Sequence, residues 1–265
     1  MNLSLQMFCN DTTWVVNDPI VVKNIMCSIN SKVGFKHLDK FPGCQPVSIE
    51  RKDLPRIVPE GYLVCDKSDG SRYLLVCVTY DSKPMCLMID RSLKTFLVNV
   101  EMKSEIFDGT VIDGELIQKE NGEFVFLLFD IMLYTGKKTT QKNYSDRKQL
   151  LNIFESHIRY CSLFKPIVKH MYNLSEYTAD TYLSDGLIFT PINKGIEFGT
   201  NFDLFKWKPG NMNTIDFLID TDYKMYLNKQ GVLQRTNNCV KIKNGINITK
   251  DIIVECKLIK NCNWE

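Results

Sequence analysis

Two lysines in the last third of the chain share a strand-like segment. Lys206 and Lys208 stand two residues apart in LFKWKP, and residues two apart on a β-strand point to the same face, about 6.6 Å from each other. We therefore expect both ammonium groups on one face, with Trp207 on the other. Because the like charges repel, an anion such as a polyphosphate between them would stabilise the pair. The alternative is that both lysines reach solvent from an edge strand.

A second cationic segment, KSDGSR, combines Lys67 and Arg72 with the pair Asp69 and Gly70. Apolar runs flank this segment on both sides. One interpretation is a β-hairpin turn beside a solvated lysine, because Asp-Gly is a favoured turn pair. The other interpretation is that Lys67 belongs to a chemical site, which the paired lysines downstream favour.

Candidate carboxylates and an aromatic residue recur at the ends of predicted strands. Glu115 follows a second Asp-Gly pair in FDGTVIDGELIQ, and Asp185 opens the strand of YLSDGLIFTP. The apolar run FVFLLFDIM ends in Phe129 and Asp130. The chain therefore offers carboxylates as well as cations at the ends of its predicted strands.

The elements that must position these residues are predicted to be mostly short β-strands. Apolar runs separated by turn residues predict strands at 62–66, 72–80, 85–90, 94–100, 110–118, 124–131 and 186–190. Past Pro209 and Gly210, a second small all-β unit is predicted from the runs TIDFLID, YKMYL, GVLQR, CVKIK and DIIVECKL.

Three helices are predicted among these strands. Asp18 as N-cap and Pro19 in the first turn begin a helix over 19–30. A second helix begins with Ser145 as its N-cap, and a short third helix is predicted over 175–183. The apolar face of the second helix is predicted to comprise Leu150, Leu151, Ile153, Phe154 and Ile158.

Bulk composition limits the classes of function. Apolar residues make up 44% and charged residues 24%, which is typical of a folded globular protein. The 33 basic and 31 acidic residues give a net charge of +2, so nucleic-acid binding would need a local patch. No signal peptide is recognisable at the N-terminus, and no apolar run approaches the roughly 20 residues that span a bilayer, so we expect no membrane association.

Cysteine and histidine usage points to free thiols rather than to disulfides or zinc. The 10 cysteines are dispersed without a CxxC pair, which predicts buried free thiols in a reducing, intracellular compartment. The 3 histidines show no zinc-ligand spacing, so a zinc site is disfavoured.

Taken in order, KSDGSR, DGEL, FDIM, DGLIF and LFKWKP with NTIDF resemble the motif series of the covalent nucleotidyltransferases. Within that superfamily the series is similar to the mRNA guanylyltransferases, or mRNA capping enzymes, and most of all to the compact type of large DNA viruses. The upstream PGCQPVSIERKD resembles the segment before the lysine motif of those enzymes, which DNA ligases lack in that form. The resemblance runs from about Pro42 to the C-terminus, and it depends on the ordered set rather than on one motif.

The resemblance implies an α+β fold in two parts. Residues 1–212 would form a nucleotidyltransferase domain of ATP-grasp-like antiparallel sheets with helices, and residues 213–265 a small OB-fold β-barrel. The sequence stops at Glu265, before the arginine- and lysine-containing motif that closes over the triphosphate in the family. We therefore expect an incomplete barrel and weak formation of the enzyme–GMP intermediate.

The activity implied is transfer of GMP from GTP to RNA through Lys67. Its amine would attack the α-phosphorus, and a 5′-diphosphate RNA end would then receive the GMP as a cap. A lysine ordinarily titrates near 10.4, so the site must hold this amine neutral. The lysines Lys206 and Lys208 would hold phosphate oxygens, and Asp185 would be a ligand of Mg²⁺ or Mn²⁺.

The resemblance also implies a nucleotide-binding set. Arg72 would contact the ribose hydroxyls, Glu115 the ribose or the metal, and Phe129 would stack on guanine. Arg72 as a surface strand residue and Phe129 as a core residue are the competing interpretations. Guanine O6 would be read by Ser68 and by a lysine between the helix and the last strands, for which we predict Lys165. Asp69 and Gly70 would complete the binding loop.

Two other functions stay open. One is an ATP-dependent polynucleotide ligase, which uses the same lysine chemistry, and the other is a non-catalytic nucleic-acid-binding relative. For a capping enzyme, an RNA triphosphatase, a cap methyltransferase and an RNA polymerase would be partners on other chains. The expected locations are the nucleus, a cytoplasmic viral factory or the virion.

Overall fold

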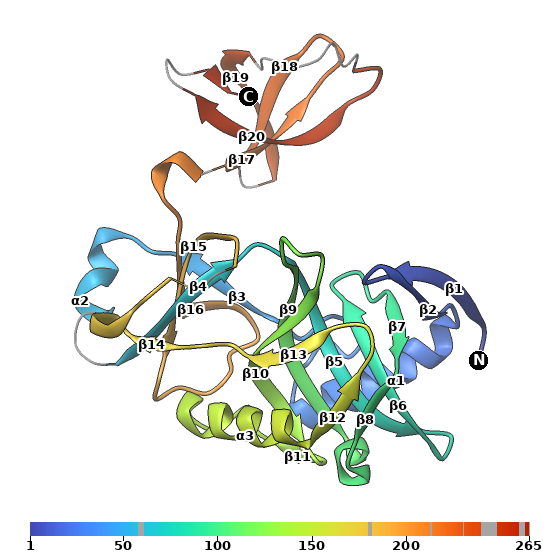
Figure 1. Cartoon of the computed structure of the whole chain (residues 1–265). Coiled ribbons are helices and arrows are strands. Elements are labelled where there is room, and N and C mark those ends of the chain that lie inside the picture. Colours follow the sequence, from blue (N-terminus) through green and yellow to red (C-terminus); the bar gives the residue numbers. More distant parts are fainter. Residues whose placement is uncertain are drawn as a thin grey trace. The chain divides into compact units, whose positions relative to one another are not determined.

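The computed structural model spans the whole chain and describes residues 1–57, 61–179, 182–212, 214–229, 231–239, 248–259 and 263–264. It divides into two compact units, Met1–Trp207 and Lys208–Glu265 (Figure 1). Both units are rich in antiparallel β-sheet, and the first also carries helices, which confirms a mixed α+β class. No helix in the described part of the chain is long and apolar enough to cross a membrane.

A nine-stranded sheet forms the centre of the first unit, in the order β1-β2-β7-β6-β5-β9-β10-β11 with β13 also paired to β10. All of its pairings are antiparallel except that of β10 with β13. The strands are β1 (Leu3–Phe8), β2 (Asp11–Val16), β5 (Ser71–Tyr80), β6 (Lys83–Asp90), β7 (Thr95–Val98), β9 (Thr110–Gln118), β10 (Phe124–Tyr134), β11 (Lys137–Lys138) and β13 (Lys165–Val168).

A separate five-stranded sheet, in the order β14-β4-β15-β16-β3, stands beside it in the first unit. A further two-stranded sheet pairs β12 with β8. These strands are β3 (Cys44–Ser48), β4 (Tyr62–Ser68), β8 (Val100–Met102), β12 (Ile158–Cys161), β14 (Tyr172–Asn173), β15 (Ser184–Pro191) and β16 (Gly199–Trp207). Each strand predicted for this unit is confirmed within a few residues. The strands that were not predicted are β1, β2, β3, β8, β11, β12, β13 and β14.

The first predicted helix is confirmed as α1 (Pro19–Val33). Asp18 caps it, because the Asp18 Oδ1 atom accepts hydrogen bonds from the amides of Ile20 and Val21 at 3.2 and 3.3 Å. The helix ends at Gly34, whose φ of +83° suits glycine. Shorter helical segments follow as 3-10 turns and one α-helical turn: η1 (Arg51–Asp53), α2 (Leu54–Ile57), η2 (Ser104–Asp108) and η3 (Leu174–Glu176).

The second predicted helix is α3 (Tyr144–His157), but its cap and face differ from the prediction. Asn143 is the N-cap, since its side chain accepts from the amide of Asp146 at 2.8 Å. The buried stripe is Tyr144, Arg147, Leu151 and Phe154, which follows the helical repeat, whereas Ile153 is exposed. The predicted face included the neighbours Leu150 and Leu151, and also Ile153 and Phe154. Neighbouring residues of a helix point in different directions, so the whole predicted set cannot face the core. The helix predicted over 175–183 is wrong, because η3 is its sole helical turn among the residues described there.

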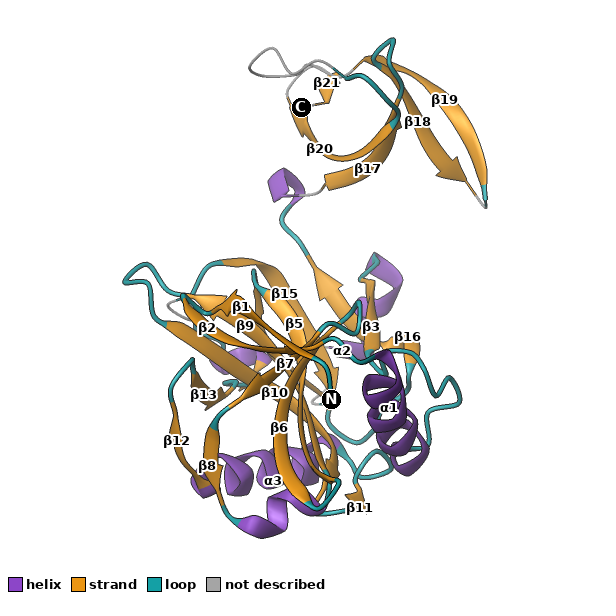
Figure 2. Cartoon of the chain, turned by 90° about the vertical axis from the view of Figure 1, so that its right-hand side faces the viewer, coloured by secondary structure: helices purple, strands orange, loops and turns teal. Residues whose placement is uncertain are grey.

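The large sheet is covered by apolar contacts on both faces. Along β5, Leu74 and Val76 belong to the same apolar cluster as the buried residues of α1, while Leu75 and Cys77 belong to the cluster that includes Leu151 and Phe154 of α3. Figure 2 shows the two helices on different sides of the strands. This alternation is what a strand buried on both faces requires. The prediction of buried free thiols is confirmed in part. The free cysteines Cys65, Cys77, Cys86 and Cys256 are buried, whereas the free cysteines Cys9, Cys27, Cys44 and Cys161 are half-buried.

The second unit is a five-stranded sheet in the order β19-β18-β17-β20-β21. Its core includes Phe217, Ile219, Met225, Ile248 and Cys256. The unit comprises the 3-10 turn η4 (Gly210–Met212) and the strands β17 (Thr214–Ile219), β18 (Lys224–Lys229), β19 (Val232–Cys239), β20 (Ile252–Ile259) and β21 (Asn263–Trp264). Four of the five strands predicted here are confirmed, and the fifth, CVKIK, lies outside the described residues apart from its first cysteine. Its identity as an OB-fold barrel stays a prediction.

Candidate active site

The segment KSDGSR joins two different sheets. Lys67 and Ser68 end β4 in the five-stranded sheet, and Ser71 begins β5 in the nine-stranded sheet. The hairpin interpretation is therefore wrong, because β4 pairs with β14 and β15 while β5 pairs with β6 and β9. The chain thus passes from one sheet to the other between β4 and β5 (Figure 1), and Lys67 lies near the end of β4, just before this passage.

Gly70 allows this passage to lie directly against β9. A Cβ atom at residue 70 would stand 2.4 Å from the carbonyl oxygen of Leu116 and 2.7 Å from the Cγ2 atom of Ile117. It would also stand 3.0 Å from the Cγ atom of Glu115. Since a side chain at residue 70 would collide with backbone, glycine brings the crossing segment next to the predicted carboxylate.

Lys67 and Asp185 form an ion pair. The Lys67 Nζ atom donates to the Asp185 Oδ1 atom at 2.6 Å, and the two side chains are 27% and 21% exposed. Asp185 belongs to an irregular part of β15, where the register with β4 shifts between Ser184 and Leu187. Such irregularities re-aim side chains. Lys67 and Asp185, two predicted site residues 118 positions apart in the sequence, are thus in direct contact. Both side chains are exposed enough for a ligand to reach them.

Arg72 is held by a set of partners that fixes its plane. Its Nε and Nη2 atoms donate to the two carboxylate oxygens of Asp113 at 2.8 and 2.5 Å, and Nη1 donates to the carbonyl of Cys44 at 2.7 Å. Burial acts to lower the pKa of Arg72, but the adjacent Asp113 carboxylate outweighs it and raises the pKa. Arg72 is therefore a buried, permanently charged group and not the surface strand arginine of the competing interpretation.

Phe129 lies at a bulge of β10. Leu128 pairs with Gly114 and Asp130 pairs with Asp113, so Phe129 has no partner residue on β9. Its ring is half-buried, and its centroid lies 5.4 Å from the Arg72 guanidinium carbon. The core interpretation of Phe129 is therefore wrong, and its ring borders the same site as Arg72.

Glu115 belongs to the same electrostatic neighbourhood. It stands opposite Arg72 in the β5–β9 register. Burial raises the pKa of the Glu115 carboxyl, while Lys169, Arg72 and Lys67 act in the opposite direction. A half-buried carboxylate is thus surrounded by cations, which is an arrangement typical of functional sites.

Ser68 contacts a lysine, but not the predicted one. The Ser68 hydroxyl accepts a hydrogen bond from the Nζ atom of Lys169 at 2.8 Å, and both residues are buried. Sequence reasoning missed Lys169. The available signal was the strand KPIV, because a lysine directly after it stands at the end of a strand, like the other site residues.

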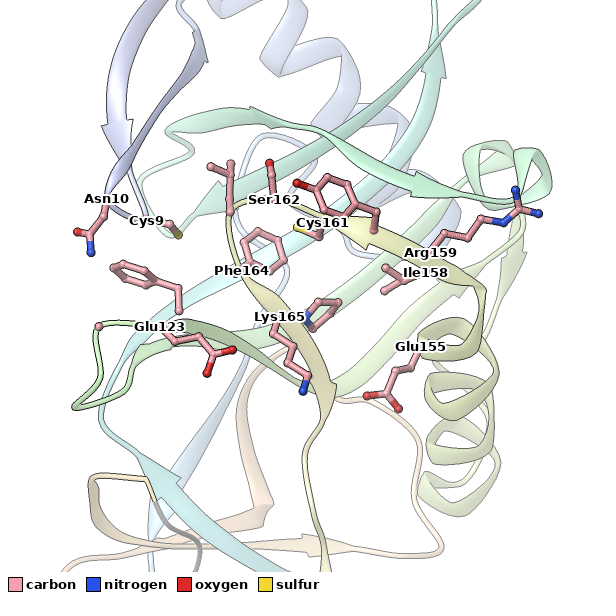
Figure 3. Close-up of a pocket in the computed structure, with 15 residues that line it drawn as sticks. Cys9, Asn10, Glu123, Glu155, Ile158, Arg159, Cys161, Ser162, Phe164 and Lys165 are labelled. Atoms are coloured by element: carbon pink, nitrogen blue, oxygen red, sulfur yellow. The ribbon is translucent and has the colours of Figure 1, made fainter.

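Lys165 does not contact Ser68 but lines an open groove of about 590 Å³ (Figure 3), whose lining includes neither Ser68 nor Lys169. Its neighbours there include Glu123, Phe124 and Arg159, and its side chain is exposed. Lys165 begins β13 and Lys169 directly follows its last residue, so the two lysines are about 13 Å apart along the strand direction. The structure therefore brings Lys169 and not Lys165 to Ser68, and the prediction of Lys165 is corrected.

The two downstream lysines belong to different units. Lys206 is half-buried on β16, opposite Ile188 of β15. Because β16 ends at Trp207, strand alternation does not extend to Lys208, which is the first residue of the second unit. We predicted that both lysines lie on one face because they would share one strand. This reason does not hold, since Lys208 lies outside β16. Asp69 is exposed, and its backbone amide donates to Leu183 at 3.1 Å.

The arrangement places an amine among cations and carboxylates and can hold an anion beside it. Lys67, Lys169 and Arg72 supply positive charge, and the carboxylates Glu115 and Asp185 supply oxygen ligands. Among the residues that the structure describes, no group of three or more His, Cys, Asp or Glu side chains could hold a metal ion. Glu115 and Asp185 are oxygen donors of the kind that Mg²⁺ binds together with water and substrate oxygens.

Comparison with known proteins gives consistent matches. A family model described as "mRNA capping enzyme, catalytic domain" matches residues 12–172. The "mRNA-capping enzyme subunit alpha" of Kluyveromyces lactis is 33% identical over 242 residues, covering 77% of this chain and 51% of that protein. The Saccharomyces cerevisiae protein of the same description is 33% identical over 224 residues, covering 70% and 49%.

A vertebrate relative and a solved structure extend the comparison. The "mRNA-capping enzyme" of Danio rerio is 29% identical over 260 residues, covering 83% of this chain and 43% of that protein. The chain thus spans about half the length of the curated relatives it matches. A mycobacterial DNA ligase D complexed with ATP and MES gives a TM-score of 0.48 at 12% identity, covering 85% of this chain and 91% of that one.

Proposed function

This chain belongs to the mRNA capping enzyme family, and we propose on that premise that it is a GTP:RNA guanylyltransferase that carries GMP on Lys67. The observation that carries the proposal is the position of Lys67. Its amine stands at the passage between two sheets, 2.6 Å from Asp185, and the next residue contacts Lys169. Lysine is a suitable covalent nucleophile when its nitrogen lone pair is free.

Two transfers would complete the reaction. In the first, the Lys67 ammonium passes a proton to the Asp185 carboxylate, which lies 2.6 Å away. The Lys67 nitrogen then attacks the α-phosphorus of GTP, so that an N–P bond forms and the P–O bond breaks to release pyrophosphate. In the second, a β-phosphate oxygen of a 5′-diphosphate RNA attacks the same phosphorus, and the N–P bond breaks to restore the lysine. The ion pair with Asp185 holds the Lys67 amine in place.

The remaining residues would bind and orient the nucleotide. Phe129 would stack on guanine, Arg72 would contact the ribose hydroxyls, and Lys169 with Ser68 would donate to guanine O6. The aromatic face and the planar guanidinium, 5.4 Å apart, support adjacent contacts to base and sugar. Asp69 and Gly70 would complete the binding loop, and Glu115 would reach the ribose or a metal.

Phosphate binding and metal binding would use further lysines and carboxylates of the chain. Lys206 and Lys208 would hold phosphate oxygens. Asp185 and Glu115 are partly exposed carboxylates, and this donor set fits Mg²⁺ or Mn²⁺, which needs few protein ligands beside phosphate and water. When bound, the ion would neutralise negative charge on the phosphates.

Finer features of the family are also proposed here. We propose a nucleotidyltransferase fold for the first unit and an OB-fold for the second, with an RNA triphosphatase, a cap methyltransferase or an RNA polymerase as partners. Similarity to the compact viral type and an intracellular, reducing location stay predictions from the sequence.

Labelling with GTP and ATP tests the proposed function. The chain is incubated with either nucleotide, labelled at the α-phosphate, in Mg²⁺ or Mn²⁺, and is then analysed by denaturing electrophoresis. We expect label from GTP and not from ATP, released by acid because the bond is a phosphoramidate, and transferred to 5′-diphosphate RNA. Label from ATP alone would indicate a ligase-type activity, and RNA binding without covalent label would indicate a binding module.

Lys169 and Lys165 should differ sharply when each is replaced by methionine. Lys169→Met removes a charged donor at the buried Ser68 contact, so we expect the KM for GTP to rise about tenfold to a hundredfold. Lys165→Met changes an exposed side chain in a separate groove, and the KM should stay within about twofold. Steady-state transfer to RNA measures both. A larger loss for Lys165→Met would restore the sequence-based prediction.

A further inference from the structure

The first turn of α3 contacts the bulge of β10 that carries Phe129. The Tyr144 hydroxyl donates to the carbonyl oxygen of Phe129 at 3.1 Å. The Nε and Nη2 atoms of Arg147 donate to the two carboxylate oxygens of Asp130 at 2.7 and 3.0 Å. Residues 129 and 130 are therefore each fixed by one side chain of the same helical turn.

Tyr144 and Arg147 are both buried, and Arg147 makes further hydrogen bonds to backbone carbonyls. Tyr144 is 2% exposed and Arg147 is 3% exposed, so water does not replace either donor. Arg147 also donates through Nη1 to the carbonyls of Lys142 and Lys194 at 2.5 and 2.9 Å. The helix start, the loop before it and the bulge are thus joined through one guanidinium group.

A bulge needs such support, because its extra residue leaves the ladder of the sheet. Where β10 pairs residue for residue with β9, the pairing fixes the direction of each side chain, and a second irregularity lies between Ile131 and Leu133. Phe129 lacks a partner residue on β9, so the direction of its ring depends on the groups that hold its own carbonyl and the next residue. Tyr144 and Arg147 are those groups.

We propose that Tyr144 and Arg147 are positioning residues that fix the Phe129 ring for stacking on guanine, which rests on the proposed function. Neither residue touches the nucleotide in this assignment, and both act through Phe129. Base stacking is the same in the bound substrate and in the transition state, so looser stacking weakens binding and leaves the chemical step unchanged.

Tyr144→Phe tests this proposal with minimal disturbance, since it removes one hydroxyl and keeps the ring. We expect the KM for GTP to rise about threefold to tenfold, the effect of one net hydrogen bond, with kcat within about twofold. Thr139→Val is the matched control. The buried Thr139 hydroxyl donates to the carbonyl of Ile131 at 2.5 Å, on the same strand but beyond the bulge, and its loss should leave KM unchanged.

A double-mutant cycle shows whether the effect passes through the ring. In a Phe129→Leu background, Tyr144→Phe should cause no further rise in KM. An equal rise in that background, a fall in kcat instead, or the same rise from Thr139→Val would overturn the proposal. Arg147→Lys, which keeps the charge but loses the two-pronged contact, should repeat the KM pattern of Tyr144→Phe.

Fluorine NMR separates this proposal from the proposed function. The chain is labelled with 4-fluorophenylalanine, and the Phe129 signal is assigned by its loss in Phe129→Leu. We expect that signal to shift or broaden in Tyr144→Phe and not in Thr139→Val, whether or not GTP reacts. An unchanged signal would overturn the positioning role, while absent GTP labelling of the unaltered chain would overturn the function alone.

Discussion

Lys67→Ala should abolish the covalent guanylate. Without the amine no N–P bond can form, so labelling from GTP should fall by roughly 10³-fold or more. Lys67→Arg should fail equally, because a guanidinium group stays protonated and offers no lone pair. The measurement is retention of α-phosphate label on the chain, with mass spectrometry locating the adduct on the peptide that contains residue 67.

The matched control is Lys119→Ala. Lys119 pairs with Glu123 at 2.9 Å and is 31% exposed, close to the 27% of Lys67, but it lies outside the proposed set. Both substitutions break one partly exposed ion pair, which costs about 1 kcal/mol or less and therefore lowers Tm by no more than about 2–4 °C. Labelling should survive Lys119→Ala. An adduct that persists in Lys67→Ala would refute the assigned nucleophile.

Local patterns were sufficient to predict most strands and the residues at their ends. Alternating apolar runs and turn residues act over a few positions, and they located β5, β6, β9 and β10 within a few residues. The helix over 19–30 followed from Asp18 and Pro19 for the same reason. The helix predicted over 175–183 failed because a weak periodic pattern carries no information on tertiary contacts, and the described residues there hold only the 3-10 turn η3.

Contacts between distant segments could not be predicted in this way. From the sequence, Gly70 is interpreted as a turn glycine. The structure shows that glycine is needed there because the carbonyl oxygen of Leu116 lies against it. The contact of Ser68 with Lys169 joins residues 101 positions apart, and the contact of Arg72 with Asp113 joins residues 41 apart. Which sheet a strand enters decides these partners, and the pairing of β4 away from β5 is a property of the whole fold.

Asp113→Asn should be among the most destabilising single changes in the first unit. Asp113 and Arg72 are 2% and 11% exposed at the side chain, so the substitution leaves a buried guanidinium without its counter-charge. Removing one partner of a buried ion pair costs about 3–5 kcal/mol. For a unit of this size, Tm should fall by roughly 6–20 °C, measured by thermal denaturation.

Two further variants decide whether charge burial is the cause. Asp203→Asn removes a carboxylate whose partners Arg56 and Lys194 are 45% and 52% exposed, so it should cost less than about 1 kcal/mol. The double change Arg72→Met with Asp113→Leu removes both charges and should be more stable than Asp113→Asn alone. That double variant should still fail to use GTP, because Arg72 is the proposed ribose contact. A double variant less stable than Asp113→Asn would show that packing, and not the unpaired charge, governs this site.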